Sequence, residues 1–196
     1  MGNPIADIPK NALSPGDLAI DCGANIGWVT GRMLARGARV IAFEPNPHAF
    51  EVLKGAHAEN PAADCRNAGV HDHDGHADLY LHHRAFEDEV HWSAGSSMLE
   101  FKGNIDPARS VRVEVVDLAR LILELDEEVA LLKIDVEGLE VPILNRLLDS
   151  GAIDRVRLTL VEAHDQRIPE LKPETDALRD RLRREGRETS IRLDWI

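Results

Sequence analysis

The hydrophobic positions of this chain form short apolar runs that alternate with longer amphipathic stretches. Apolar runs that predict buried strands occupy residues 18–20, 38–43 and 129–134, and a further strand is expected at residues 156–161. Stretches with helical spacing follow them at residues 28–36, 47–59, 139–148 and 174–184. Strands that alternate with helices predict an α/β fold. We therefore expect a doubly wound, mostly parallel sheet with helices on both faces.

The pattern changes after a third expected strand at residues 65–70. Residues 78–81 and 111–115 alternate between polar and apolar side chains, which is typical of exposed or edge strands. The link between them, residues 84–110, has no sustained helical spacing, and a link of this length inside a compact domain is more often a functional lid than an accident. We therefore expect residues 71–116 to form a hairpin with a substrate-covering insertion.

A glycine-rich turn follows the first apolar run. Asp21 ends that run, and Gly23, Ala24, Asn25 and Gly27 come directly after it. A buried strand that turns at once into a helix is where open α/β sheets bind nucleotides. Glycines allow positive φ and let the backbone approach a ligand closely. The turn is therefore the first candidate binding site.

The residues around this turn favour one class of nucleotide. Glu44 and Pro45 end the second apolar run, and a carboxylate there can accept both ribose hydroxyls of an adenosine. The dinucleotide fingerprint GxGxxG would need glycine in place of Asn25, and a pyrophosphate would face Asp21. S-adenosylmethionine carries an ammonium and a sulfonium, which an acid attracts. We therefore expect S-adenosylmethionine rather than NAD.

Three motifs together resemble a known family. They are DCGANIG from Asp21 to Gly27, FEPNP from Phe43 to Pro47, and LKIDVEG from Leu132 to Gly138. The chain is similar in these motifs to the FkbM family of S-adenosylmethionine-dependent methyltransferases, which are largely O-methyltransferases. The similarity extends over residues 18–164. It implies a Rossmann-like class I methyltransferase fold, with the cofactor held by Asp21, Gly23, Ala24, Asn25, Gly27, Glu44 and Pro45.

The end of the chain departs from the class I pattern, which normally closes with a hairpin of two strands. Here there is room for one strand, at residues 189–195, so the sheet is expected to lack a terminal strand. An uncovered edge is an aggregation liability. We therefore expect either a homodimer through this edge or a longer full-length protein. Residues 1–196 are otherwise expected to form one domain, with residues 1–16 as an entry segment.

Composition narrows the partners. The formal net charge of −12 disfavours nucleic acid and anionic membranes, and an aromatic content of 4% provides few platforms for base stacking. No apolar run approaches a membrane span, and the first residues have no signal pattern. Cys22 and Cys65 are expected on strands separated by a third, which is too far for a disulfide. These features predict a cytoplasmic protein with reduced cysteines.

Ionisable residues follow two central strands. Asp135 and Glu137 come after the strand expected at 129–134, and Glu162 and His164 come after the strand expected at 156–161. Carboxyl ends of parallel strands meet at one edge of a sheet, so we expect these four residues to converge, with Asp135, Glu162 and His164 as the catalytic candidates. His164 can act as a base for a hydroxyl with Asp135 or Glu162 assisting, or the carboxylates can hold a divalent cation. The sequence leaves both alternatives open.

The sequence thus predicts O-methylation of a hydroxyl on a small molecule or a glycan. One alternative is a Rossmann-like nucleotide-binding module without catalysis, which the missing strand keeps open. The other is an NAD-dependent oxidoreductase, disfavoured by the absent fingerprint. Histidines at residues 71 and 73 are interpreted as hairpin surface rather than as a zinc site.

Overall fold

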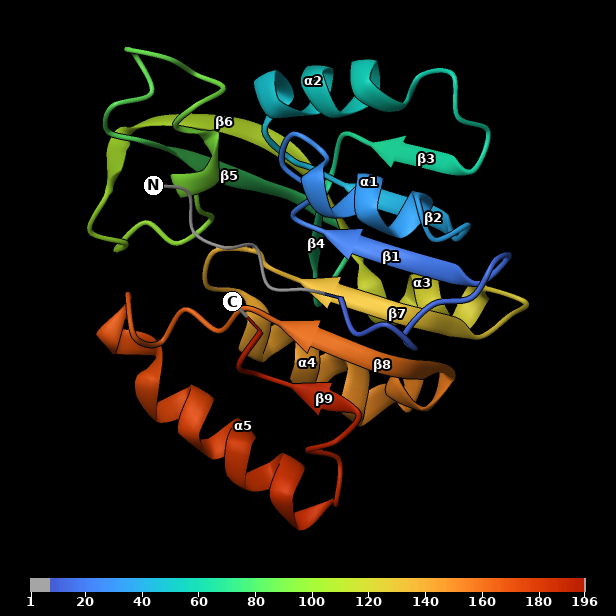
Figure 1. The fold of residues 1–196 in the computed structure, drawn as a ribbon. Helices are drawn as coiled ribbons and strands as arrows, with labels where there is room; N and C mark the ends of the chain where they lie inside the picture. The colour runs from blue at the N-terminus through green and yellow to red at the C-terminus, as the bar shows by residue number, and fades with distance from the viewer. Residues whose placement is uncertain (1–7, 196) are drawn as a thin grey trace.

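The computed structural model describes residues 8–195, and its centre is a six-stranded sheet in which every pairing is parallel (Figure 1). The strand order is β3-β2-β1-β7-β8-β9. These strands are β1 (Leu18–Cys22), β2 (Arg39–Phe43), β3 (Ala63–Arg66), β7 (Val129–Ile134), β8 (Val156–Val161) and β9 (Ile191–Arg192). The order runs outward in both directions from β1 and β7, which confirms the doubly wound α/β fold.

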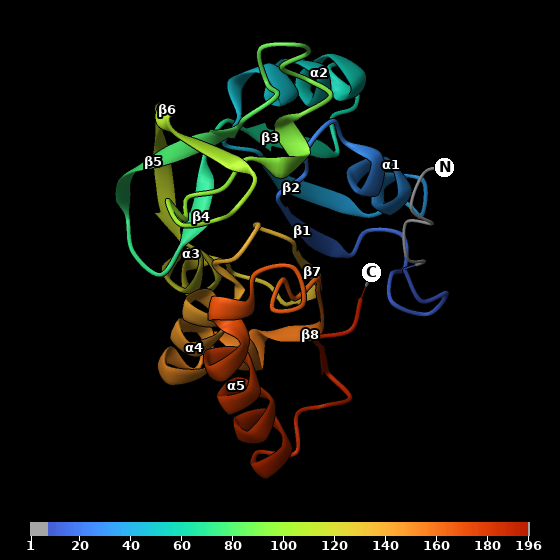
Figure 2. The ribbon, with the colours of Figure 1, turned by 90° about the vertical axis from the view of Figure 1, so that its left-hand side faces the viewer.

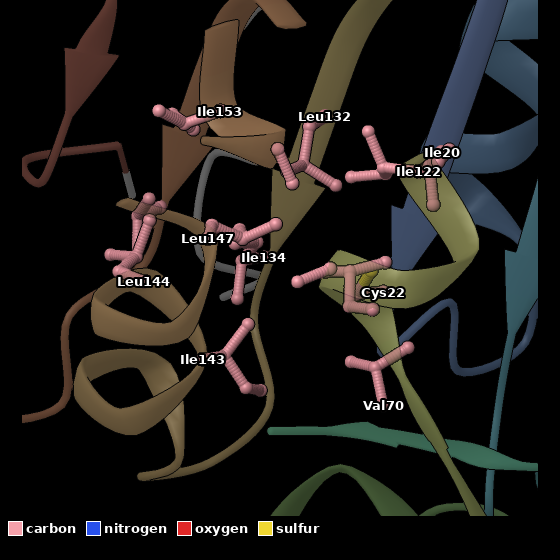
Figure 3. Close-up of a cluster of buried hydrophobic side chains, with 14 of the residues drawn as sticks. Ile20, Cys22, Val70, Ile122, Leu132, Ile134, Ile143, Leu144, Leu147 and Ile153 are labelled. Atoms are coloured by element: carbon pink, nitrogen blue, oxygen red, sulfur yellow. The ribbon is translucent and has the colours of Figure 1, made fainter. Parts of the chain in front are cut away.

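Helices cover both faces of this sheet, as the two views in Figures 1 and 2 show. They are α1 (Trp28–Leu34), α2 (Pro47–His57), α3 (Leu118–Glu124), α4 (Glu140–Ser150) and α5 (Lys172–Arg184). Successive strand side chains point to opposite faces. Ala19 of β1 accordingly packs in the cluster that includes residues of α1 and α2, whereas Ile20 packs in the cluster with α3, α4 and α5. Figure 3 shows the second cluster, in which Leu132 and Ile134 lie near the apolar side chains of α3 and α4.

The ends of the helices follow local sequence signals. Asn46 caps α2, because its side chain accepts hydrogen bonds from the backbone N–H groups of the first turn, and Pro47 occupies the first helical position. Gly151 adopts φ 77° at the C-terminus of α4. Asp117 caps α3 by accepting a hydrogen bond from Arg120 N. These residues fix where α2 and α3 begin and where α4 ends.

A second, three-stranded sheet has the order β4-β6-β5 and stands beside the carboxyl ends of β1 and β2. Its strands are β4 (Gly69–His71), β5 (Gly75–His82) and β6 (Ile105–Asp117). The antiparallel pairing of β5 with β6 confirms the expected hairpin. Two expectations were wrong in their bounds. The strand expected at 65–70 is divided between β3 and β4, and β6 begins inside the link expected to be free of strands.

The segment between β5 and β6, residues 83–104, is called the covering segment below. It contains the single-turn 3-10 helix η1 (Ser93–Gly95), and most of it lacks regular structure. Figure 2 shows it arching over the region where β1, β2 and β7 end. Its role as a cover for a substrate stays a prediction.

The sequence predicts an entry segment at residues 1–16 and a last strand at residues 189–195. Residues 1–7 of the entry segment lie outside the described residues, whereas Ile8, Ala12 and Leu13 are buried against the face that α1 and α2 cover. β9 has two residues instead of the expected seven, and no strand lies beyond it within residues 8–195.

Cys22 and Cys65 are free and lie on strands separated by β2. Within the same residues no helix has the length and apolar character to span a membrane.

Candidate functional site

A cavity of about 100 Å³ lies where β1, β2 and β7 end, beneath the covering segment. Four of the predicted cofactor residues line it: Gly23, Asn25, Glu44 and Pro45. Asp135 lines it as well, together with side chains of the covering segment. Asp21, Ala24 and Gly27 do not reach its surface. The structure therefore brings the glycine turn after β1 and the ends of β2 and β7 to one cavity.

The glycine turn is held by backbone contacts. The N–H groups of Gly23 and Ala24 both donate to the carbonyl oxygen of Phe43, at 3.0 and 2.9 Å. Gly23 has φ 76°, and a Cβ on it would lie 1.8 Å from the carbonyl oxygen of Asp135. Both features exclude a side chain at this position. Gly23 thus lets β1 and the KIDVEG loop pass close to each other at the cavity wall.

Glu44 is a buried acid whose two oxygens are each bound once. Oε2 accepts a hydrogen bond from Asn25 N at 2.8 Å, and Oε1 accepts one from Asn46 N at 2.8 Å. Burial raises the pKa of Glu44 to about 7, although the two backbone N–H groups and the charge of Lys133 act in the opposite direction. Each carboxylate oxygen keeps a further lone pair for a donor in the cavity.

Asp21 lies behind the cavity wall, where it is fully buried. The register of β1 and β7 places it opposite Lys133, whose Nζ is 3.3 Å from Asp21 Oδ1 and 3.3 Å from Asp135 Oδ2. Burial acts to lower the pKa of Lys133, but Asp135 and Asp21 outweigh it and raise that pKa. Thr30 donates to the second oxygen of Asp21 at 2.6 Å. Contact of Asp21 with a cofactor ammonium stays a prediction.

The three catalytic candidates converge as expected. Asp135, Glu162 and His164 each offer a ligand atom, and these atoms lie within 4.8 Å of one another. Burial raises the pKa of Asp135 to about 6, with the charge of Lys133 opposing it. Asp135 lines the cavity, whereas Glu162 and His164 do not. Their catalytic roles stay predictions.

His164 is held between acids. Its Nδ1 lies 2.9 Å from Glu140 Oε1, and its Nε2 lies 3.3 Å from Glu137 Oε2 and 3.8 Å from Asp135 Oδ1. Burial acts to lower the pKa of His164, but Glu137 and Glu140 outweigh it and raise that pKa to about 10. In this arrangement the imidazole is charged at neutral pH.

The covering segment is fastened to the loops below it. Asn25 Nδ2 donates to Ser93 Oγ at 2.9 Å, and Ser97 Oγ donates to the carbonyl oxygen of Glu137 at 2.7 Å. Lys102 Nζ donates to Glu137 Oε2 at 2.5 Å and to the carbonyl oxygen of Gly95 at 2.9 Å. The segment is therefore tied to both the glycine turn and the KIDVEG loop.

Several site residues were missed from the sequence. Lys133 carried a usable signal, since a lysine inside a fully apolar strand implies a buried partner, and Asp135 follows it on the same face. Ser96 and Ser97 resemble a position of the FkbM family, but the sequence assigns them no contact. Lys102 carried no signal, because the path of the covering segment decides where it lies.

Comparison with known proteins gives three findings. Residues 21–189 match the family model of the methyltransferase FkbM domain. AMB antimetabolite synthetase AmbE of Pseudomonas aeruginosa is 31% identical to this chain. The alignment is 221 positions long and covers 94% of this chain. The chain spans about 10% of the length of that relative. A crystal structure of methyltransferase FkbM from Methylobacillus flagellatus KT superposes with a TM-score of 0.46 and 15% identity, over 70% of this chain and 30% of the other.

Proposed function

Because this chain belongs to the FkbM methyltransferase family, we propose that it transfers a methyl group from S-adenosylmethionine to a hydroxyl oxygen of a small molecule. The observation that carries the proposal is the cavity that joins the glycine turn, Glu44 and Asp135. Glu44, which we assign to the ribose, and Asp135 both line this cavity.

The chemistry of the cavity fits an adenosine. Glu44 has lone pairs for the two ribose hydroxyls. Ser96 Oγ is buried and, within residues 8–195, has no hydrogen-bond partner, so a polar group of a ligand would satisfy it. Val70, Leu79 and Met98 supply apolar surface for a purine.

The volume of about 100 Å³ is small for such a ligand, since ligand cavities are usually about 300–1,000 Å³. The covering segment forms the wall through Ser93, Ser96, Ser97 and Met98. We propose that this segment moves outward when the cofactor enters. Its return would exclude water from the reaction.

The residues contribute alignment rather than covalent chemistry. When bound, S-adenosylmethionine supplies a methyl group on a sulfonium, which becomes a neutral thioether. Asp135 would accept a hydrogen bond from the acceptor hydroxyl and hold its oxygen in line for attack. We assign this contact to Asp135 rather than to His164, because His164 is buried and does not line the cavity.

A small-molecule acceptor is supported by the relative AmbE, which is named as a synthetase of an antimetabolite. The net charge of −12 supports an acceptor that is neutral or cationic, and it speaks against nucleic acid as acceptor. A glycan hydroxyl remains within the same chemistry. We place the reaction in the cytoplasm, in line with the reduced cysteines.

Calorimetry tests the cofactor. We expect binding of S-adenosylmethionine and S-adenosylhomocysteine and none of NAD. Glu44→Ala should weaken binding by about 1.5–3 kcal/mol, the contribution of a hydrogen bond to a charged group. Glu59→Ala, which removes an exposed acid at the end of α2, is the matched control. Tight binding of NAD alone would refute the assignment.

Transfer of labelled methyl groups to an extract of the source organism tests the reaction. We expect label on oxygen of a small product, lost in Asp135→Ala. Cofactor binding without any labelled product would support the non-catalytic module instead. Label only on nitrogen would refute O-methylation and leave the cofactor assignment intact.

A further inference from the structure

The environment of His164 is not explained by the cofactor cavity. The side chain is 1% exposed, and Nε2 has no hydrogen bond of acceptable geometry among residues 8–195. Glu140 meets the other ring nitrogen at 2.9 Å. A carboxylate on one imidazole nitrogen fixes the tautomer and aims the lone pair of the other, as is usual for metal-ligating histidines.

Asp135 and Glu137 approach that nitrogen at 3.8 and 3.3 Å, and Glu162 lies in the same cluster of possible ligands. Asp135 follows β7 and Glu162 follows β8, and these strands pair in parallel. One oxygen of each and one nitrogen of His164 lie within 4.8 Å of one another. Three donors on two rigid strand ends thus converge on a single point.

The charges around this point are unbalanced. The acids in and around the cluster of Asp135, Glu162 and His164 are connected by their contacts with His164, Lys133 and Arg167. They are Asp21, Asp135, Glu137, Glu140 and Glu162. The lysine and arginine side chains that meet them are Lys102, Lys133 and Arg167. A metal-ligating histidine has given up its proton, and with His164 in that neutral form the carboxylates exceed the cations by two, which is the charge that a divalent ion supplies.

We propose that Asp135, Glu162 and His164 bind one divalent transition-metal ion, for which Mn²⁺ is a suitable probe. Mg²⁺ and Ca²⁺ prefer oxygen ligands, whereas first-row transition ions also accept imidazole. The three protein ligands leave positions open for water or for an acceptor oxygen.

The ion would lie between two cavities. Asp135 lines the cofactor cavity, and Glu162 lines a second cavity of about 400 Å³ formed by the loop after β8, by α5 and by the chain around β9. A hydroxyl bound to the ion from that side would have a lowered pKa. This use of the ion rests on the proposed function, whereas its binding does not.

Another cluster, His71, Asp72 and His73, has donor atoms at similar spacing. Both histidines contact the same Asp72 oxygen, and His73 is exposed. No buried, unpartnered side-chain atom of the described residues belongs to this cluster. It serves as the competing location in the experiment.

The experiment titrates Mn²⁺ into the full chain after treatment with a chelator, and measures free Mn²⁺ by electron paramagnetic resonance. We expect one ion per chain. Glu162→Gln should weaken binding at least about tenfold. Arg167→Gln should strengthen it, because Arg167 pairs with Glu162 at 2.9 Å and competes with the ion. Glu59→Gln and His73→Asn should leave it unchanged.

Folding of each variant is checked by circular dichroism and by binding of S-adenosylhomocysteine, which Glu162→Gln should retain because Glu162 does not line the cofactor cavity. Absence of stoichiometric Mn²⁺ binding in folded wild-type protein would overturn the site. Unchanged affinity in both Glu162→Gln and Arg167→Gln would do so too, as would loss of binding in His73→Asn. Cofactor binding without Mn²⁺ binding would refute this inference alone.

Discussion

At the scale of single residues, Gly23 is the position with least tolerance. Its φ of 76° and the 1.8 Å approach of a Cβ to a backbone oxygen mean that Gly23→Ala must move either the turn or the KIDVEG loop. We expect the free energy of unfolding to fall by about 3 kcal/mol or more, and cofactor binding to be lost.

Gly55→Ala is the matched control, measured alongside by urea denaturation. Gly55 lies in α2, where an added methyl group would meet no atom within 4 Å, so the substitution should stabilise the protein by about 0.5–1 kcal/mol. Equal effects of the two substitutions would contradict the role given to Gly23.

The raised pKa of Glu44 predicts how cofactor affinity depends on pH. In the free protein Glu44 is protonated below about pH 7, because burial outweighs the N–H groups of Asn46 and Asn25 and the charge of Lys133, while Asp135 adds to the upward shift. Ribose hydroxyls that donate to Glu44 favour the ionised form. Affinity should therefore rise with pH through 7, and be about tenfold weaker at pH 6 than at pH 8.

Calorimetry with S-adenosylhomocysteine across this range measures the effect. Glu44→Gln should bind more weakly and show a flat profile between pH 6 and 8. A wild-type profile that is flat, or that falls with rising pH, would remove Glu44 from the ribose site.

At the scale of elements, the ion pair of Lys102 with Glu137 is one of the contacts that fasten the covering segment. Lys102 is buried and reaches Glu137, itself largely buried, so Lys102→Met removes the nearer cation of that carboxylate and leaves it the contact with His164 at 3.3 Å. We expect a loss of about 3 kcal/mol in the free energy of unfolding and faster amide exchange across residues 93–104.

Hydrogen exchange read by mass spectrometry locates the effect. Lys54→Met, which changes an exposed lysine of α2, should alter stability by less than about 0.5 kcal/mol and leave exchange in residues 93–104 unchanged. Equal protection of this segment in Lys102→Met and wild type would show that the ion pair does not hold it.

The elements differ in how far the sequence predicts them. The bounds of β7 and β8 are predicted to the residue. For β7 the reason is that a strand buried on both faces is apolar at nearly every position, whereas β8 is fully buried only from Thr159 to Val161. The division of residues 65–70 between two sheets is not predicted, because Asn67 and Ala68 carry no strong turn signal. In the same way, Glu44 and Asp135 could be placed because parallel strands end at one edge, whereas the tertiary path of the covering segment decides the partners of Lys102.

At the scale of the whole molecule, the exposed edge of the large sheet at β9 keeps the homodimer as a prediction. β9 is two residues long, and no strand of residues 8–195 pairs on its outer side, so this edge can accept a strand of a second copy. We expect light scattering coupled to size-exclusion chromatography to give the mass of two chains. A monomer mass that holds over a wide concentration range would contradict this expectation.

The pairing of β1 with β7 also determines when this sheet can be completed. Cys22 lies opposite Ile134, so about 110 residues separate the partners at the centre of the sheet. Synthesis at about 5–20 residues per second puts roughly 5–20 seconds between the two strands. During that interval β1 has a free edge toward the place of β7, although β2 and β3 can already pair on its other side. A nascent chain therefore carries a central strand with one unpaired edge until residues 129–134 have left the ribosome, which makes early chaperone contact with residues 18–22 an expected step in its production.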